Sequence, residues 1–188
     1  MATTLTVHRK GCHHLVTTSI RFQDPKQELD AGSLRARLRE WEFGARKLWN
    51  GGLGPQAWGK CQLGFSNDWQ VGGMASGSHY VQVQGGRGDF LVDMTWLGPA
   101  STVGSWHIGS SSTVAAHEVG HLLGLPDEYG YDAQGKYVNL NKQPGGSPQS
   151  ILAQTWSPVA ALPEHLDKIL ANWGRHVPRP ARAGSFRS

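Results

Sequence analysis

The stretch "AAHEVGHLLGLPDEYG" limits the fold and chemistry of this chain more than any other part of its sequence. His117 and His121 lie four positions apart, so on a helix they project from the same face, one turn apart. The ring nitrogens of both can then reach one zinc ion at about 2.0–2.1 Å. We therefore expect a helix over residues 112–123, with Ser112 or Thr113 as its N-cap, that holds two metal ligands.

The residues that follow the second histidine predict a sharp end to this helix. Gly124 stands where a helix commonly ends in a left-handed conformation, and Pro126 cannot continue a helix with a normal hydrogen bond. The chain must turn there, which can carry Asp127 back beneath the metal. Three protein ligands would leave a fourth position for water, and that open position distinguishes catalytic zinc from structural zinc. We therefore expect one zinc ion held by His117, His121 and Asp127.

Glu118 is the candidate general base of this site. It points roughly 100° around the helix from His117, so it does not easily join the same ligand set. It can reach a water on the open side of the metal, which is the place of the base in an H-E-x-x-H motif. The glutamate, Gly124 and the acid at 127 together favour a metal site over a buried helix whose histidines only bond to their neighbours.

Three other residues compete with Asp127 for the third ligand position. Glu128 is adjacent to it, Glu164 would complete the site from a second helix, and His165 is a further candidate. His107, shortly before the metal helix, either lines the cleft or is an ordinary surface residue of a strand. The sequence leaves these alternatives open.

The rest of the chain predicts an α+β fold, with a single domain over residues 1–174 and a basic, flexible tail over 175–188. A helix that Ser33 can cap is expected over 33–52, because apolar residues recur at helical spacing. A last helix is expected over 163–173, with a proline in its first turn. Short segments rich in β-branched and apolar residues predict strands at 14–23, 61–65, 79–84, 89–97 and 105–110. We expect these strands to form a twisted mixed sheet.

Composition and charge limit the classes of function that this chain can have. The formal net charge is +4 and the pI is about 9.3, but no nucleic-acid recognition motif accompanies the basic tail. No apolar run is long enough to span a membrane. The N-terminal residues lack the apolar core of a signal peptide, so the compartment is open: the cytosol, export by a leaderless route, or a domain of a longer chain.

Cys12 and Cys61 fit no metal pattern and form either one disulfide or two buried thiols. The "RGD" at 87–89 matches an adhesion motif by chance.

The stretch "HEVGHLLGLPD" resembles the metzincin signature H-E-x-x-H-x-x-G-x-x-[H/D] in its aspartate variant. It looks most like the small neutral proteases of the snapalysin type, which have G-L-P-D at this point. The G-L-P-D-x-Y run is also similar to secreted metalloproteases of the immune-inhibitor-A class. The close match covers about 15 residues, and the order of elements extends it loosely to the whole chain. The resemblance implies a mixed sheet whose edge strand binds an extended peptide beside the zinc.

The chain departs from the metzincin pattern at one place. Metzincins have a methionine in a turn beneath the metal, and this chain has no methionine after Met94. We expect Leu152, within "SPQSILAQTW", to take its place, because leucine and methionine are similar in volume. Where several metzincins have a tyrosine, this chain has Gln154. Three other tyrosines are candidates for the same phenol: Tyr129, Tyr131 and Tyr137.

The sequence therefore predicts a zinc endopeptidase with a protein or peptide substrate. Two alternatives remain, a zinc amidase that acts on cell-wall peptides and a catalytically dead zinc-binding interaction module. Retention of Glu118 argues against the second of these, since a purely structural site needs no base. Delivery as a bacterial toxin or effector is a further hypothesis, with a protein inhibitor or immunity protein as partner.

Overall fold

The computed structural model describes most of the chain, namely residues 3–8, 13–24, 27, 29–52, 62–72, 79–84, 91–93, 103–145, 147–156 and 159–173. Several features of the sequence lie outside these residues: Cys12, Cys61, the 87–89 tripeptide and the C-terminal residues 174–188. Within the described part, no helix is both long and apolar enough to cross a membrane.

Six strands form one mixed sheet in the order β1-β2-β4-β6-β5, and β3 also pairs with β2. Strands β2, β3, β4 and β6 pair in parallel, whereas β1 and β5 lie antiparallel to their neighbours. Their bounds are Thr3–His8, His13–Gln23, Gln62–Val71, His79–Gln84, Leu91–Asp93 and Val103–His107 for β1 to β6. Together with the helices, this sheet is consistent with the expected α+β class.

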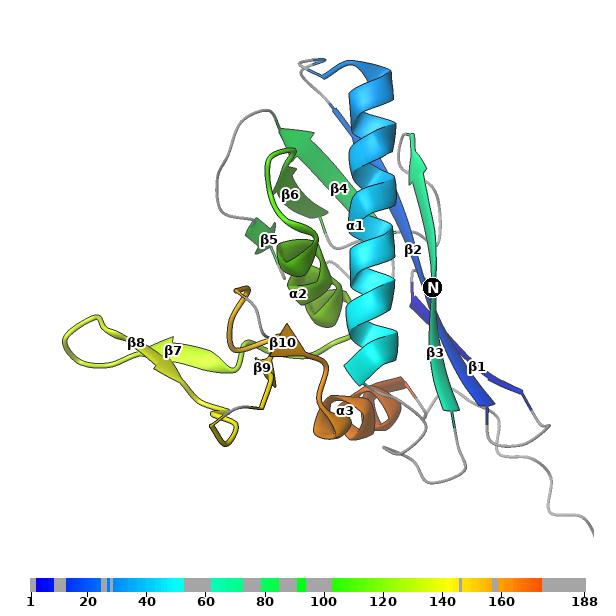
Figure 1. Ribbon diagram of the computed structural model, residues 1–188. Helices are drawn as coiled ribbons and strands as arrows, with labels where there is room; N and C mark the ends of the chain where they lie inside the picture. Colours follow the sequence, from blue (N-terminus) through cyan, green and yellow to red (C-terminus); the bar gives the residue numbers. More distant parts are fainter. Residues whose placement is uncertain are drawn as a thin grey trace, which may run out of the picture.

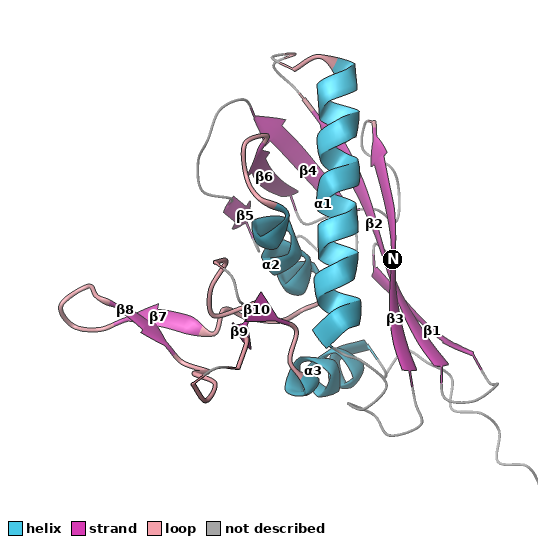
Figure 2. Cartoon of the chain, in the orientation of Figure 1, coloured by secondary structure: helices cyan, strands magenta, loops and turns pink. Residues whose placement is uncertain are grey.

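Three helices accompany the sheet in the described residues: α1 (Ala31–Gly52), α2 (Ser112–Leu122) and α3 (Pro163–Trp173). Figure 1 shows α1 running along the sheet with α2 beside it and α3 near the C-terminal end of α1. Two small strand pairs lie between α2 and α3, namely β7 (Tyr129–Tyr131) with β8 (Tyr137–Asn139) and β9 (Gln149–Ser150) with β10 (Val159–Ala160). Figure 2 shows that these short strands and their loops lie apart from the large sheet.

The core has two clusters of buried side chains, both on the face that α1 and α2 cover. One joins the sheet to the helices through Phe22, Trp41 and Trp106, whose rings contact one another with centroids 5.3–6.3 Å apart. The other joins α1, α2 and α3 to the 150–153 turn. The apolar residues that recur at helical spacing along α1 face the core: Leu34, Leu38, Trp41 and Ala45 are buried, and Leu48 is half-buried. Trp49 is a further buried residue of this helix.

Several expected boundaries were wrong. Helix α1 starts two residues before Ser33, because the carboxylate of Asp30 accepts the Ser33 N–H at 2.8 Å and serves as the cap. Helix α2 is capped by Ser111, whose hydroxyl accepts the Val114 N–H at 3.3 Å, and not by Ser112 or Thr113.

The strands differ from expectation in their lengths. Strand β3 extends to residue 71, because it pairs in parallel with β2 over ten positions. Strand β6 spans 103–107 and not 105–110, because the chain turns at 108–109. Strand β5 is described over 91–93 alone, and β1 was not expected. The stretch between α2 and α3 also contains the short strands β7, β8, β9 and β10, which the sequence did not predict.

Candidate metal centre

Two tryptophans of α1 hold α2 in place. The indole N–H of Trp41 donates to the carbonyl of Ser110, just before the N-cap of α2, at 2.9 Å. The indole N–H of Trp49 donates to the carbonyl of Ala116 at 2.9 Å, one residue before the first histidine of the motif. Because both indoles are fully buried, these bonds fix the position of α2 along α1.

The C-terminal end of α2 forms a Schellman motif around Gly124, which has a positive φ of 85°. The N–H of Leu125 donates to the carbonyl of Gly120 at 3.1 Å, and the N–H of Gly124 donates to that of His121 at 2.8 Å. The expected glycine turn is confirmed. It reverses the chain and places the carbonyl of Leu125 next to the ring of His121.

Both histidines have their orientation fixed by the main chain. Nδ1 of His117 lies 2.8 Å from the carbonyl oxygen of Ile151, and Nδ1 of His121 lies 2.8 Å from that of Leu125. A carbonyl oxygen can only accept a hydrogen bond, so each Nδ1 carries a proton and donates it. In the neutral rings the lone pair is then on Nε2, the arrangement typical of metal-ligating histidines.

Three acceptor atoms converge beside α2. The two Nε2 atoms are 3.1 Å apart, and Oδ1 of Asp127 lies 3.2 Å from Nε2 of His117 and 3.3 Å from Nε2 of His121. Tetrahedral coordination at about 2.0–2.1 Å separates neighbouring ligand atoms by about 3.3–3.4 Å. The spacing and the donor set, two imidazoles and one carboxylate, therefore fit a zinc ion.

The electrostatics of these groups favour a positive charge between them. Burial disfavours charge on Asp127, but pairing with the two imidazoles, which donate from Nε2 when they are protonated there, outweighs it and holds the pKa of this carboxyl far below its usual value. Burial likewise opposes protonation of His121, but its bonds to Asp127 and Leu125 outweigh it and raise the pKa of that imidazole. A cation at this point, whether proton or metal, is stabilised by the carboxylate.

Glu118 lies beside these three groups and is 6% exposed. Burial raises the pKa of its carboxyl, and the nearby histidines partly offset this effect. Its carboxylate also lies close enough to the two imidazoles to form a group whose potential ligand atoms are all within 4.8 Å of one another. The contacts of Asp127 with the two Nε2 atoms, at 3.2 and 3.3 Å, are shorter. Asp127 is therefore the third member of the converging group, and Glu118 lies next to it.

The structure places the other candidate ligands in a separate cluster. Glu128 and His165 bond to each other, with Nε2 of the imidazole 3.0 Å from Oε2 of the carboxylate. Glu164 accepts a hydrogen bond from the side-chain amide of Asn141 at 3.1 Å. His107 is half-buried at the end of β6.

The turn expected to lie beneath the metal packs directly against α2. Leu152 is fully buried, and a Cβ added to Gly120 of α2 would lie 2.5 Å from its Cδ2 atom. Glycine at 120 therefore lets the turn approach closely enough for the carbonyl of Ile151 to reach His117.

Of the three candidate tyrosines, Tyr129 is the one whose ring contacts a histidine of the converging group. Its ring centroid lies 6.3 Å from that of His117, and its ring also stacks on Tyr137 at 5.7 Å. Burial raises the pKa of its phenol, and the negative charge of Asp127 adds to the effect. Tyr131 is 69% exposed on the same hairpin.

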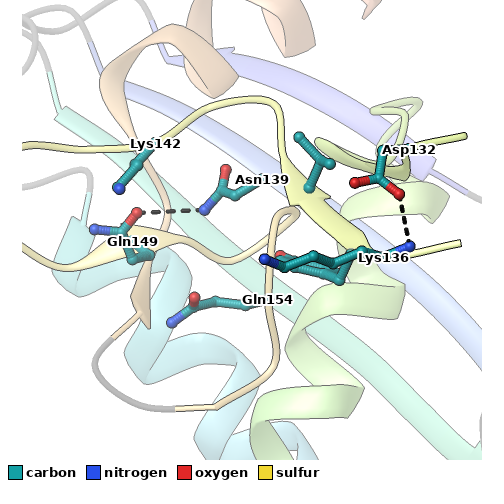
Figure 3. A pocket seen from close by; sticks show the side chains of 8 residues that line it. Asp132, Lys136, Asn139, Lys142, Gln149 and Gln154 are labelled. Carbon is teal, nitrogen blue, oxygen red and sulfur yellow. Dashed lines mark hydrogen bonds between the residues drawn. The ribbon is translucent and has the colours of Figure 1, made fainter. Parts of the chain in front are cut away.

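A hollow of about 510 Å³ begins at Tyr137. The hairpin β7–β8 and the loop before the 150–153 turn form its walls, and Figure 3 shows Lys136, Lys142 and Gln154 around it. Gln154 takes part in this wall, which is the position where several metzincins have a tyrosine. Tyr137, which lines the hollow, stacks on Tyr129, and Tyr129 in turn contacts His117.

The sequence did not reveal the partners that orient this site. Every residue has a backbone carbonyl, so no sequence pattern could single out those of Ile151 and Leu125 as partners of the histidines. Trp49 was detectable, since it falls four positions after Ala45 on the apolar face of α1. The pairing of Glu128 with His165 spans 37 positions, and no local pattern predicts such a contact.

Comparisons of the chain with protein-family profiles, with curated proteins and with solved structures found no match. The inference of function therefore rests on the geometry of this site and on the motif that builds it.

Proposed function

We propose that this chain is a zinc-dependent endopeptidase of the metzincin type. His117, His121 and Asp127 would hold one zinc ion, and Glu118 would act as the general base. The alternatives, a cell-wall amidase and a dead binding module, would keep the same three ligands, so substrate and activity must separate them.

One observation carries the proposal: three acceptor atoms, two Nε2 lone pairs and one carboxylate oxygen, converge within 3.1–3.3 Å. Such a set is repulsive unless a cation lies between its members. The imidazoles are held from behind by carbonyls, so they cannot turn their lone pairs away without losing buried hydrogen bonds.

The chain's own residues supply the acid–base chemistry. Zinc, when bound, supplies a Lewis acid that polarises a peptide carbonyl and lowers the pKa of water. Glu118 takes the proton from the attacking water and delivers it to the leaving amine. Its raised pKa favours this role, because a base whose pKa lies closer to the working pH both accepts and returns a proton more readily.

Tyr129 is our candidate for the group that stabilises the developing oxyanion. Its ring lies against His117, and its phenol is protonated at neutral pH, since the ordinary pKa of about 10 is raised further by burial. A protonated phenol can donate a hydrogen bond to the negative oxygen that forms on the scissile carbonyl.

The surroundings favour a peptide as substrate. Strand β5 ends the strand order of the large sheet and pairs with β6, which leads into α2. Exposed apolar side chains lie on the β7–β8 hairpin and next to it, including Tyr131, Leu140 and Trp156. An extended peptide that adds to a sheet edge gains main-chain hydrogen bonds, and apolar side chains nearby give it further contacts.

The first prediction tests the base. Glu118→Gln should remain folded and zinc-loaded but cleave casein and a quenched peptide about 10²–10⁴-fold more slowly, because proton transfer alone is lost. Zinc content, circular dichroism and kcat/KM are measured for both proteins, with Glu164→Gln as a matched control that keeps full activity. Cleavage of cell-wall peptides but not casein would favour the amidase. A wild-type protein that binds zinc but cleaves neither would favour the dead module.

A further inference from the structure

A second buried carboxylate besides Glu118, that of Glu128, directly follows Asp127 in the chain but bonds to a different set of side chains. It is 6% exposed, and its two oxygens accept from four donors. Oε1 accepts from the ammonium of Lys168 at 2.8 Å, while Oε2 accepts from the amide of Asn141 at 2.9 Å and from the hydroxyl of Ser150. The fourth donor is the imidazole of His165. These bonds hold the pKa of the Glu128 carboxyl far below its usual value although burial opposes them.

The tautomer of His165 follows from its other nitrogen. The N–H of Leu162 donates to Nδ1 at 3.0 Å, so Nδ1 carries no proton. The proton is therefore on Nε2, which donates to Oε2 of Glu128 at 3.0 Å. A fully buried neutral histidine thus orients the carboxylate, and Lys168 supplies the compensating charge.

The main chain of Glu128 is also fixed on both sides. Its N–H donates to the carbonyl of Leu152 at 2.9 Å, and its carbonyl accepts from the N–H of Leu140 at 2.8 Å. The 150–153 turn therefore contacts both Glu128 and, through the carbonyl of Ile151, the ring of His117.

Asp127 has no such anchors of its own. In the part of the chain that the structure describes, its main chain makes no hydrogen bond with another backbone group, and its side chain is 42% exposed. Its place next to the histidines depends on the residues before and after it, namely the Leu125 end of the Schellman motif and Glu128.

We propose that Glu128 is a positioning residue, which Ser150, His165 and Lys168 hold so that Asp127 is presented to the two histidines. The proposal rests on the zinc centre proposed above. Glu128 would contact neither metal nor substrate. It would act by fixing the course of the main chain next to Asp127.

The test measures metal binding directly. Glu128→Gln keeps the size of the side chain but puts an NH₂ group among donors that need an acceptor. We expect it to weaken zinc binding by about 10–100-fold in competition with a chelator, as loss of outer partners of a metal ligand typically does. The visible spectrum of the cobalt-substituted protein should shift towards that of Asp127→Ala. Glu164→Gln, which removes a neighbouring carboxylate bonded to Asn141, should change neither measurement.

A further variant, Lys168→Met, keeps the test decisive if Glu128→Gln does not fold. It removes the partly exposed donor and should weaken zinc binding in the same direction by a smaller factor. Where Glu128→Gln does fold, adding Lys168→Met to it should cause no further loss, because both act through one carboxylate. Wild-type zinc affinity and cobalt spectrum in Glu128→Gln, or in Lys168→Met, would overturn the positioning role while leaving the zinc centre intact. The zinc centre itself would fail if Asp127→Ala bound zinc as well as the wild type.

Discussion

At the scale of single residues, the two histidines owe the orientation of their rings to carbonyl groups from different segments. Ile151 lies in the turn before β10, whereas Leu125 lies in the turn that ends α2. Each carbonyl fixes one tautomer, so both lone pairs point to the same place as Asp127. In the proposed zinc centre, this arrangement would orient the ligands before the ion binds and so reduce the ordering that binding must impose.

The second prediction compares two carboxylates. Asp127→Ala should weaken zinc binding strongly, because it removes one of three converging atoms, whereas Glu164→Ala should leave it nearly unchanged. Zinc affinity of purified protein, measured by chelator competition, checks both. The reverse pattern would mean that a glutamate of α3 completes the site and that the metzincin-type ligand set is wrong.

The third prediction concerns the phenol beside His117. Tyr129→Phe keeps the ring that stacks on Tyr137 and loses the hydroxyl alone. If this hydroxyl stabilises the oxyanion, kcat should fall by about 10²–10³-fold with zinc affinity unchanged. Tyr131→Phe, at an exposed position of the same hairpin, serves as control and should keep its kcat. An unchanged kcat in Tyr129→Phe would remove this residue from the mechanism.

At the scale of elements, the helices α1 and α2 meet at a glycine. A Cβ added to Gly44 would lie 2.3 Å from Cβ of Ser112, in the first turn of α2. A Cβ atom is fixed to the backbone and cannot rotate away, so the helices themselves would have to move apart. The close approach brings Trp41 and Trp49 within reach of the carbonyls that they bind on α2.

The fourth prediction follows from this contact. Gly44→Ala gains about 1 kcal/mol of helix propensity, but forcing the helices apart costs about 1–3 kcal/mol. We expect a net loss of stability in denaturant unfolding, and Ser112→Gly in the same chain should restore part of it by removing the opposing Cβ. Gly145→Ala, where an added Cβ meets nothing within 4 Å, is the control. A Gly44→Ala protein as stable as the wild type would argue against tight helix contact.

At the scale of the whole molecule, the sequence predicted those features that arise from short stretches of chain. Helix α3 has the expected bounds, strand β4 matches 79–84, and Gly124 ends α2 as expected. The N-caps were misplaced because several residues near each helix start can accept a backbone hydrogen bond.

The features that the sequence did not reveal depend on long-range contacts. The order of the strands, the carbonyl of Ile151 behind His117 and the cluster around Glu128 join residues far apart in sequence. Both members of the Glu128–His165 pair were named as candidate ligands from their residue types. Residue type alone cannot distinguish a metal ligand from the partner of another buried side chain.

The last prediction links metal binding to the stability of the molecule. The three proposed ligands lie on α2 and the turn after it, and the 150–153 turn contacts both. A ligand that binds the folded state alone stabilises it by about 2.7 kcal/mol at a hundredfold excess over its Kd. For a chain of 188 residues this corresponds to a rise in Tm of about 5–10 °C. Thermal unfolding with zinc and with a chelator measures the rise.

Glu118→Gln should show the same rise as the wild type, since it retains all three ligands, whereas His121→Ala should show almost none. An equal rise in His121→Ala would mean that zinc binds elsewhere, and no rise in the wild type would contradict the metal centre.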